Sequence, residues 1–236
     1  MAIEEAEYFF ANGTEYMADG DFAKAIVNYT KAIELDSSEA AFFACRGVAY
    51  SGKGDYDRAI ADYTEAIRTG SDVASFFGNR GAAYSGKGDY GKAIADYTEA
   101  IRLDSKEPAY FYSRGNTYRD MNDYGNALAD FNEVIRLGPP QAIFFGCRGR
   151  IHLETGGYDE AIADYTRAIE LSSDPETAEY FVGRGKAYFE KKEFEMVIAD
   201  FESALAIPDG HIDRFMIHGL LGFAKILRND KNAAGS

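Results

Sequence analysis

Apolar and small residues recur along the chain at the spacing of α-helices. Between residues 56 and 67 they fall three or four positions apart, which is the period of one helical face and not the alternation of a strand. These positions are Tyr56, Ala59, Ile60, Tyr63, Ala66 and Ile67. A second kind of stripe carries a glycine at its centre, as in FFGNRGAAY, and SGKGDY at 51–56 and 85–90 separates the two kinds. Because the glycines of SGKGDY break one helix and its aspartate can cap the next, the pattern predicts helix–turn–helix units.

The central glycine gives the length of the unit. It recurs every 34 residues, with one interval of 36, at Gly13, Gly47, Gly81, Gly115, Gly149, Gly185 and Gly219. With this glycine at position 8, the predicted repeats are 6–39, 40–73, 74–107, 108–141, 142–175 and 178–211, and an unpaired helix follows at 212–228. The two extra residues fall in the DPET turn at 174–177, where a repeat array tolerates insertion. We expect a single solenoid over 6–228 and a disordered tail at 229–236.

Seven positions of the unit carry a family pattern. In the third repeat, positions 4, 8, 11, 17, 20, 24 and 27 are Phe77, Gly81, Tyr84, Tyr90, Ala93, Tyr97 and Ala100. This pattern resembles the tetratricopeptide-repeat (TPR) family over residues 6–211 and on through the seventh helix. The departures are His152 at position 11, Val134 at 27 and Val197 at 20, and only Pro139 keeps the proline near position 32. The resemblance implies an all-α, right-handed α-solenoid of six repeats plus a C-terminal capping helix, acting as a non-enzymatic scaffold for protein–protein interaction.

The glycine at position 8 needs a physical reason. In a helix interior it costs about 1 kcal/mol relative to alanine. Its recurrence therefore predicts a close approach of the partner helix, with the small residues at positions 20 and 27 in the contact. We expect the aromatic residues at positions 17 and 24 to fill the space beside it.

Oppositely charged residues recur at positions 7 and 23. Position 7 is Arg46, Arg80, Arg114, Arg148 and Arg184, and position 23 is Asp62, Asp96, Asp130, Asp164 and Asp200. In the first repeat both change together, to Asn12 and Asn28. We interpret the two sets as a structural ladder of Arg–Asp pairs, formed either within a repeat or across to the next. His218 at position 7 of the last helix favours the cross-repeat form. The alternative is a row of arginines for an acidic ligand.

Charge and composition limit the functional classes. The formal net charge is −14, which disfavours a general nucleic-acid binder because such proteins need a basic surface. No stretch approaches the roughly 20 apolar residues of a membrane span. The first residues, MAIEEAEYFF, are acidic where a signal peptide is basic, so we expect a cytoplasmic protein. A removed leader and a longer parent chain both remain open.

Catalytic and cofactor signatures are weak. GVAYSGKG at 47–54 and GAAYSGKG at 81–88 match part of a phosphate-binding loop, but glycine follows the lysine where serine or threonine is needed. The two cysteines, Cys45 and Cys147, lie three repeats apart and form no CxxC motif. We therefore predict no enzyme activity, no cofactor and no metal.

A candidate binding groove follows from the resemblance. In the TPR family the first helices line the concave surface, chiefly through positions 2, 5, 6, 9 and 12. Carried over, these positions give small residues in the early repeats and then a mixed set: Asn79, Tyr112, Asn116, Arg119, Cys147, Arg150, Lys186 and Phe189. Because three of these residues are cationic, we expect an extended or helical partner peptide with some acidic character.

The seventh helix offers a second surface. We predict one apolar arc formed by Ile212, Phe215, Met216, Leu220, Phe223, Ile226 and Leu227, with Ile217 and Leu221 outside it. A terminal helix of a solenoid is normally polar on its outer side. We therefore expect a monomer with an imperfect cap, a weak homo-oligomer that associates through this helix, or an interaction domain of a larger protein in which a further repeat covers it.

Overall fold

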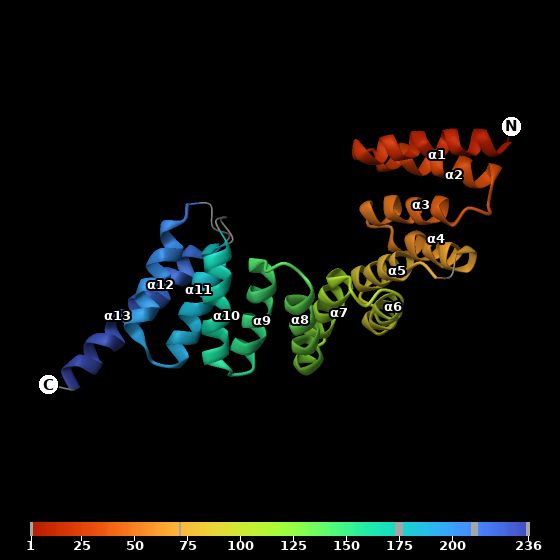
Figure 1. Ribbon diagram of the computed structural model, residues 1–236. Helices are drawn as coiled ribbons and strands as arrows, with labels where there is room; N and C mark the ends of the chain where they lie inside the picture. The colour runs from red at the N-terminus through yellow and green to blue at the C-terminus, as the bar shows by residue number, and fades with distance from the viewer. Residues whose placement is uncertain (1, 71, 173–176, 209–211, 235–236) are drawn as a thin grey trace. The chain divides into compact units, whose positions relative to one another are not determined.

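The protein is built from α-helices, α1 to α13 (Figure 1). The computed structural model describes residues 2–70, 72–172, 177–208 and 212–234, with side chains described over 3–229 of these ranges, and contains no strand there. Within the same ranges, no helix has both the length and the apolar character to cross a bilayer. The predicted DPET insertion falls largely on residues 174–176, outside the described residues.

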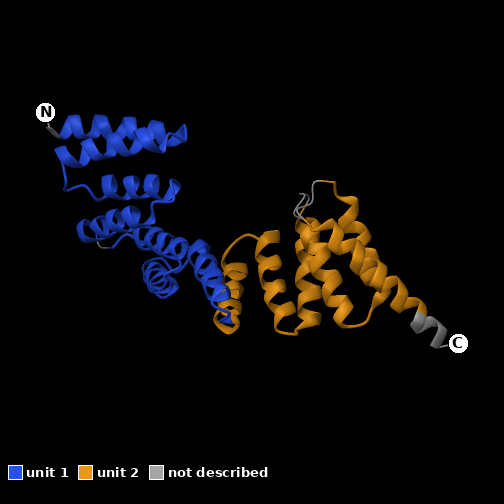
Figure 2. Ribbon diagram, turned by 180° about the vertical axis from the view of Figure 1, so that it is seen from behind, with its two compact units in different colours: residues 1–123 blue, residues 124–236 orange. Residues whose placement is uncertain are grey.

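The helices form two compact units, residues 1–123 and 124–236 (Figure 2). Unit 1 holds α1 (Ala2–Ala18), α2 (Phe22–Leu35), α3 (Ala40–Gly52), α4 (Tyr56–Thr69), α5 (Ala74–Lys87), α6 (Tyr90–Leu103) and α7 (Pro108–Asp120). Unit 2 holds α8 (Tyr124–Leu137), α9 (Ala142–Glu154), α10 (Tyr158–Leu171), α11 (Thr177–Glu190), α12 (Phe194–Ala206) and α13 (Arg214–Ala234). The boundary falls between the two helices of the predicted fourth repeat, so a single continuous solenoid stays a prediction.

Within each unit the helices stack in chain order. The two helices of a repeat pack together, as in α1 with α2 and α11 with α12. Each second helix also packs on the first helix of the next repeat, as in α2 with α3 and α12 with α13. This order of contacts is that of a solenoid of helix pairs, and it confirms the predicted fold class.

Position 8 glycines make the close approach that the pattern predicts. The Cβ of an alanine at Gly13 would lie 2.7 Å from the ring of Tyr29, and one at Gly47 would lie 2.9 Å from the ring of Tyr63. Both rings come from position 24 of the second helix. The residues at positions 20 and 27 have no exposed surface, including the two valines that replace alanine. These are Ala25, Ala32, Ala59, Ala66, Ala93, Ala100, Ala127, Val134, Ala161, Ala168, Val197 and Ala204.

The turns inside repeats use glycine and aspartate as predicted, with one difference. Gly54 and Gly88 have φ of +75° and +84°, a conformation that glycine adopts without strain. Asp55 caps α4 by accepting a hydrogen bond from the backbone N–H of Arg58 at 3.3 Å. Asp89 makes no such cap and pairs with the Lys92 ammonium at 2.7 Å.

The last helix departs from the prediction in length and in orientation. It continues to Ala234, so the expected disordered tail is wrong over 229–234, and the final two residues lie outside the described part. No proline or glycine interrupts the segment before residue 235. Its lysine and two alanines favour helix, whereas Asn229, Asp230 and Asn232 do not. The predicted apolar arc is also wrong as a buried face, because Ile217, Leu221 and Ala224 are buried while Phe215 is 91% exposed.

Candidate partner-binding site

First helices of unit 2 surround a cavity of about 420 Å³. Most of its lining residues stand at positions 2, 5, 6, 9 and 12 of their repeats, at or near α9, α11 and α13. They include Arg150, Leu153, Glu179, Val182, Lys186 and Met216. These are the positions that the resemblance assigned to the groove, so two predicted groove residues, Arg150 and Lys186, lie in one cavity.

A second cavity adjoins the first. It has a volume of about 440 Å³ and shares Leu153 and Lys186 with the first cavity. Its other lining residues are mostly apolar and include Phe189, Phe201 and Leu220. Lys186 therefore stands at the border of the two cavities.

The charges of the first cavity are mixed. Arg150 lies 3.9 Å from Glu179, measured from Nη2 to Oε2, and Glu154 and Asp213 add two more carboxylates. Lys186 is exposed and takes part in none of the ion pairs found among the described residues. The cavity is therefore not a basic surface. Among its described lining residues Arg150 lies near Glu179, which leaves the ammonium group of Lys186 to pair with a ligand.

A buried tyrosine lies at the floor of this cavity. Tyr165 is 4% exposed, and an alanine at Gly183 would collide with its ring. Burial raises the pKa of the Tyr165 phenol above its usual value, while the charge of Arg150 acts in the opposite direction. The hydroxyl therefore keeps its proton at neutral pH and remains a hydrogen-bond donor.

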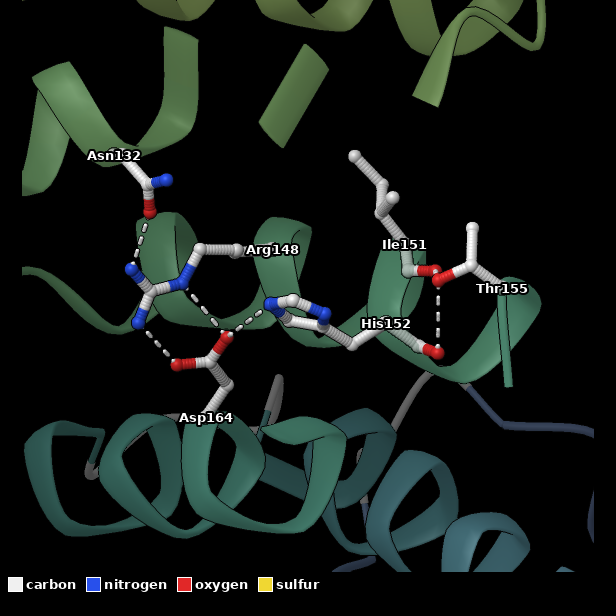
Figure 3. Close-up of polar contacts among 6 residues, drawn as sticks. All are labelled: Asn132, Arg148, Ile151, His152, Thr155 and Asp164. Carbon is white, nitrogen blue, oxygen red and sulfur yellow. Dashed lines mark hydrogen bonds and ion pairs between the residues drawn. The ribbon is translucent and has the colours of Figure 1, made fainter. Parts of the chain in front are cut away.

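The predicted Arg–Asp pairs form within repeats, between the first and the second helix. Arg148 donates from Nε and Nη2 to the two carboxylate oxygens of Asp164 at 2.8 and 2.6 Å (Figure 3). The same two-pronged contact joins Arg46 to Asp62, Arg80 to Asp96 and Arg184 to Asp200. Four of the predicted pairs are confirmed; Arg114 and Asp130 belong to different units. The cross-repeat form of the pair that His218 suggested is wrong at these four positions.

Each arginine also reaches the preceding repeat. Its Nη1 donates to the residue at position 25 there, as from Arg46 to Thr30 at 3.1 Å and from Arg148 to Asn132 at 2.7 Å (Figure 3). Arg80, Arg114 and Arg184 make the same contact to Thr64, Thr98 and Thr166. These acceptors were not predicted, although threonine recurs at position 25 with the same period as the arginines.

An aromatic ring also contacts each of these guanidinium groups. The central guanidinium carbon lies 5.6–5.9 Å from the ring centroid of the phenylalanine at position 4 of the same helix in five repeats. Hydrogen bonding to aspartate raises the pKa of Arg46, Arg80 and Arg184, partly offset by burial. An arginine held by an aspartate, a neighbouring repeat and a ring is a structural group, which favours the ladder over the ligand site.

Comparison with known proteins identifies the repeat. A model described as "TPR repeat" matches residues 13–54 and 149–192, and one described as "Tetratricopeptide repeat" matches 46–108 and 79–142. Together the matches span well over half of the chain. The chain belongs to the tetratricopeptide-repeat family. Comparison with curated protein sequences gives no match.

Solved structures with the TPR fold are similar to most of the chain. A structure titled "Functional Characterization of Pseudomonas Aeruginosa pilF" has a TM-score of 0.76 at 18% identity and covers 92% of this chain and 98% of its own. YrrB, described as "a TPR protein with an unusual peptide-binding site", has a TM-score of 0.66 at 24% identity, covering 78% and 93%. A MamA structure has a TM-score of 0.64 at 23% identity, covering 67% and 92%. At such identities the likeness establishes the fold. Membership of the TPR family supports a general role as a protein–protein interaction scaffold, and such scaffolds are typically not enzymes.

The TPR positions do not all face the groove as expected. Cys147 at position 6 is 7% exposed, so its assignment to the binding surface is wrong. The ring of Tyr180 on α11 packs over Gly146, beside Cys147, and the absence of a side chain on that glycine lets α11 approach closely. At this repeat, position 6 is therefore covered by the neighbouring helix.

The remaining predicted groove residues lie in unit 1. Asn79, Tyr112 and Asn116 are half-buried, and Asn116 donates to the backbone oxygen of Tyr112 at 2.9 Å. Arg119 donates from Nη2 to Asp120 at 2.8 Å. The negative charge of Asp120 partly offsets the positive charge of Arg119, so Arg119 attracts an acidic partner less than expected.

Proposed function

We propose that the chain is a non-enzymatic scaffold that binds a short segment of a partner protein in the two adjoining cavities of unit 2. The carrying observation is the position of Lys186, which lines both cavities and has an exposed ammonium group. Clefts lined by apolar side chains with a few polar groups are the usual ligand sites of proteins. The peptide-binding site named for YrrB supports a peptide as the ligand class here.

The lining residues suggest the chemistry of that segment. Leu153, Val182 and Met216 offer apolar contact in the first cavity, and Phe189 and Leu220 offer it in the second. A carboxylate on the partner would pair with Lys186 between them. We therefore propose a segment with one acidic residue flanked by apolar side chains. The three carboxylates of the first cavity disfavour a strongly acidic peptide.

A random peptide library selected on the full chain tests this proposal. Selected peptides should carry an acidic residue with apolar neighbours, and Lys186→Glu should weaken their binding by about tenfold or more, because an attraction becomes a repulsion. Lys106→Glu is the matched control, since it makes the same charge change at an exposed site in unit 1. Equal affinities for the two variants, measured by calorimetry, would exclude this site.

Self-association through the last helix is a second candidate function. It is favoured by one observation, the exposure of large apolar side chains on α13, where Phe215 is 91% and Ile226 is 59% exposed. Single exposed apolar residues are ordinary, but a row on one helical face indicates an interaction surface.

A further inference from the structure

One side of α13 carries a row of four residues that no other helix covers within the described part of the chain. Phe215, Gly219, Gly222 and Ile226 are all exposed, and no side chain lies within 4 Å of where a Cβ would stand on either glycine. The opposite side of α13 packs into unit 2 through Ile217, Leu221 and Ala224. We call the four exposed residues the end face of α13.

In every other repeat of unit 2 the equivalent side of the first helix is covered by the second helix. On α11, positions 4, 8 and 11 are Phe181, Gly185 and Tyr188, and the ring of Phe201 from α12 lies 2.6 Å from the Cβ position of Gly185. Phe181 and Tyr188 pack against the same buried cluster. The end face of α13 has the positions of a first helix without the helix that such positions normally contact.

The end face is complementary to itself. Its residues are separated by four, three and four positions, which is the spacing of the seam between two paired helices. The two large side chains stand at the ends and the two glycines in the middle. In an antiparallel pair related by a two-fold axis between residues 220 and 221, Phe215 of each copy meets Ile226 of the other. Gly219 then faces Gly222, where the missing side chains allow close approach.

The same helix also carries the features of a second helix. Within a repeat, the position 8 glycine contacts a small residue at position 20 and a ring at position 24, as Gly81 contacts Ala93 and Tyr97. Gly219 and Phe223 repeat this spacing of four residues, and Phe223 is 50% exposed. A second α13 can therefore supply the ring that Gly219 lacks.

Charge near the end face differs from that of the chain as a whole. The chain as a whole carries −14, so two copies repel one another. Arg214, Lys225 and Arg228 make α13 locally basic, and Lys225 Nζ also lies 2.8 Å from Glu202. The local surface does not share the acidic excess of the molecule.

We propose that the end face of α13 docks on the end face of a second copy of this chain, antiparallel and around a two-fold axis. The inference rests on the second candidate function and gives it a geometry. Because only four residues per copy form the seam, the dimer is weak and depends on concentration. Salt strengthens it by screening the repulsion between acidic chains. The cavities of unit 2 lie on another side of α13, toward Met216 and Leu220, and stay open in this dimer.

Sedimentation equilibrium of the full chain over a concentration series measures the association. The average mass should rise toward that of a dimer, and Phe215→Glu or Ile226→Glu should each raise the dissociation constant by about tenfold or more, since each places two charges in the seam. Val27→Glu is the matched control, because Val27 on α2 is a branched aliphatic residue with 54% exposure, close to that of Ile226. Circular dichroism checks that each variant is folded.

The outcomes separate the inference from the function on which it rests. A chain that remains monomeric at the highest concentration overturns both. A dimer that tolerates Phe215→Glu and Ile226→Glu as well as it tolerates Val27→Glu overturns only the proposed geometry.

A spin-label distance tests the direction of the pair. Nitroxides are attached at Asn229→Cys in a chain with Cys45→Ala and Cys147→Ala, and their separation is measured by pulsed electron resonance. The antiparallel pair places them about 26 Å apart along the helix axis. A separation near the 8–10 Å between axes of parallel neighbours overturns the antiparallel geometry.

Discussion

The first and second repeats have the same helix pairing but differ in their polar contacts. Gly13 meets the ring of Tyr29 in the first, and Gly47 meets the ring of Tyr63 in the second. The second repeat adds the pair of Arg46 with Asp62, whereas Asn28 in the first repeat donates to the backbone of its own helix at Lys24. The fold of a repeat therefore depends on the glycine–ring contact. The ionic pair is an addition to that contact. A third hydrogen bond of Arg46, to the hydroxyl of Thr30, joins the second repeat to the first.

The largest effect is expected from removing one partner of the ionic pair. Asp62→Ala leaves the guanidinium of Arg46, whose side chain is 17% exposed, without its carboxylate and should cost about 3 kcal/mol. Asn28→Ala, at the same position of the first repeat, should cost far less. The double variant Arg46→Met with Asp62→Leu should lose less stability than Asp62→Ala alone. Urea unfolding followed by circular dichroism measures all three, and equal midpoints for the single and double variants would contradict the account.

A smaller effect, equal in both repeats, is expected at position 8. Gly13→Ala and Gly47→Ala should each cost about 1–3 kcal/mol, because the rings they would strike are buried and cannot move away freely. Gly91→Ala is the control, since nothing lies within 4 Å of its Cβ position, and it should stabilise α6 by up to about 1 kcal/mol. Thermal unfolding measures the Tm of the three variants, which should fall for the first two and not for Gly91→Ala. A rise in Tm for Gly13→Ala or Gly47→Ala would show that the close approach is not required.

The link between the two repeats is expected to be weaker still. Thr30→Val removes the acceptor for Nη1 of Arg46 and should cost about 1 kcal/mol. Thr69→Val is a suitable control: Thr30 and Thr69 each donate to a backbone oxygen four residues earlier, at 2.7 and 2.9 Å, and no arginine hydrogen bond to Thr69 is found among the described residues. If both valine variants unfold at the same urea concentration, the cross-repeat hydrogen bond contributes nothing measurable.

The smallest effect is expected from transplanting the pair. Asn12→Arg with Asn28→Asp should change the stability of the first repeat by no more than about 1 kcal/mol, because the cost of burying the charges offsets their attraction. A gain as large as the loss from Asp62→Ala would show that the pair stabilises by itself, and the comparison of the two repeats would then need another explanation.

Most of the helical architecture could be predicted because the sequence contains several copies of the same helix–turn–helix repeat. Comparison of one repeat with another identified the glycine, the rings and the arginines by their common period. Thr30 and its equivalents were overlooked because a threonine on a helix surface is unremarkable until the neighbouring repeat is placed beside it. The sequence shows that Asp120 follows Arg119. Whether its carboxylate pairs with the guanidinium, and so offsets a positive charge of the predicted groove, depends on side-chain geometry.

The last helix shows where the prediction failed for a physical reason. Its buried face was inferred from one apolar arc of the helix, which included Phe215 and left out Ile217. The register of the repeat would have served better, since position 10 is buried in repeats two to six, at Ala49, Ala83, Thr117, Ile151 and Ala187, and Leu221 stands at that position. Contacts set by a neighbouring helix thus outweigh the hydrophobicity of the helix itself. The boundary between the two units was equally invisible, because the repeat pattern continues through it.

The reach of each arginine into the preceding repeat has a consequence for how the chain unfolds. Arg46 contacts its own first helix through a ring, its second helix through Asp62, and the previous second helix through Thr30. Opening one repeat therefore exposes polar groups of the next, which raises the coupling between neighbours relative to the intrinsic stability of each. Within a unit we expect unfolding to proceed in cooperative blocks longer than a single helix pair, with the first repeat, where asparagine replaces arginine at position 7, the one most readily released.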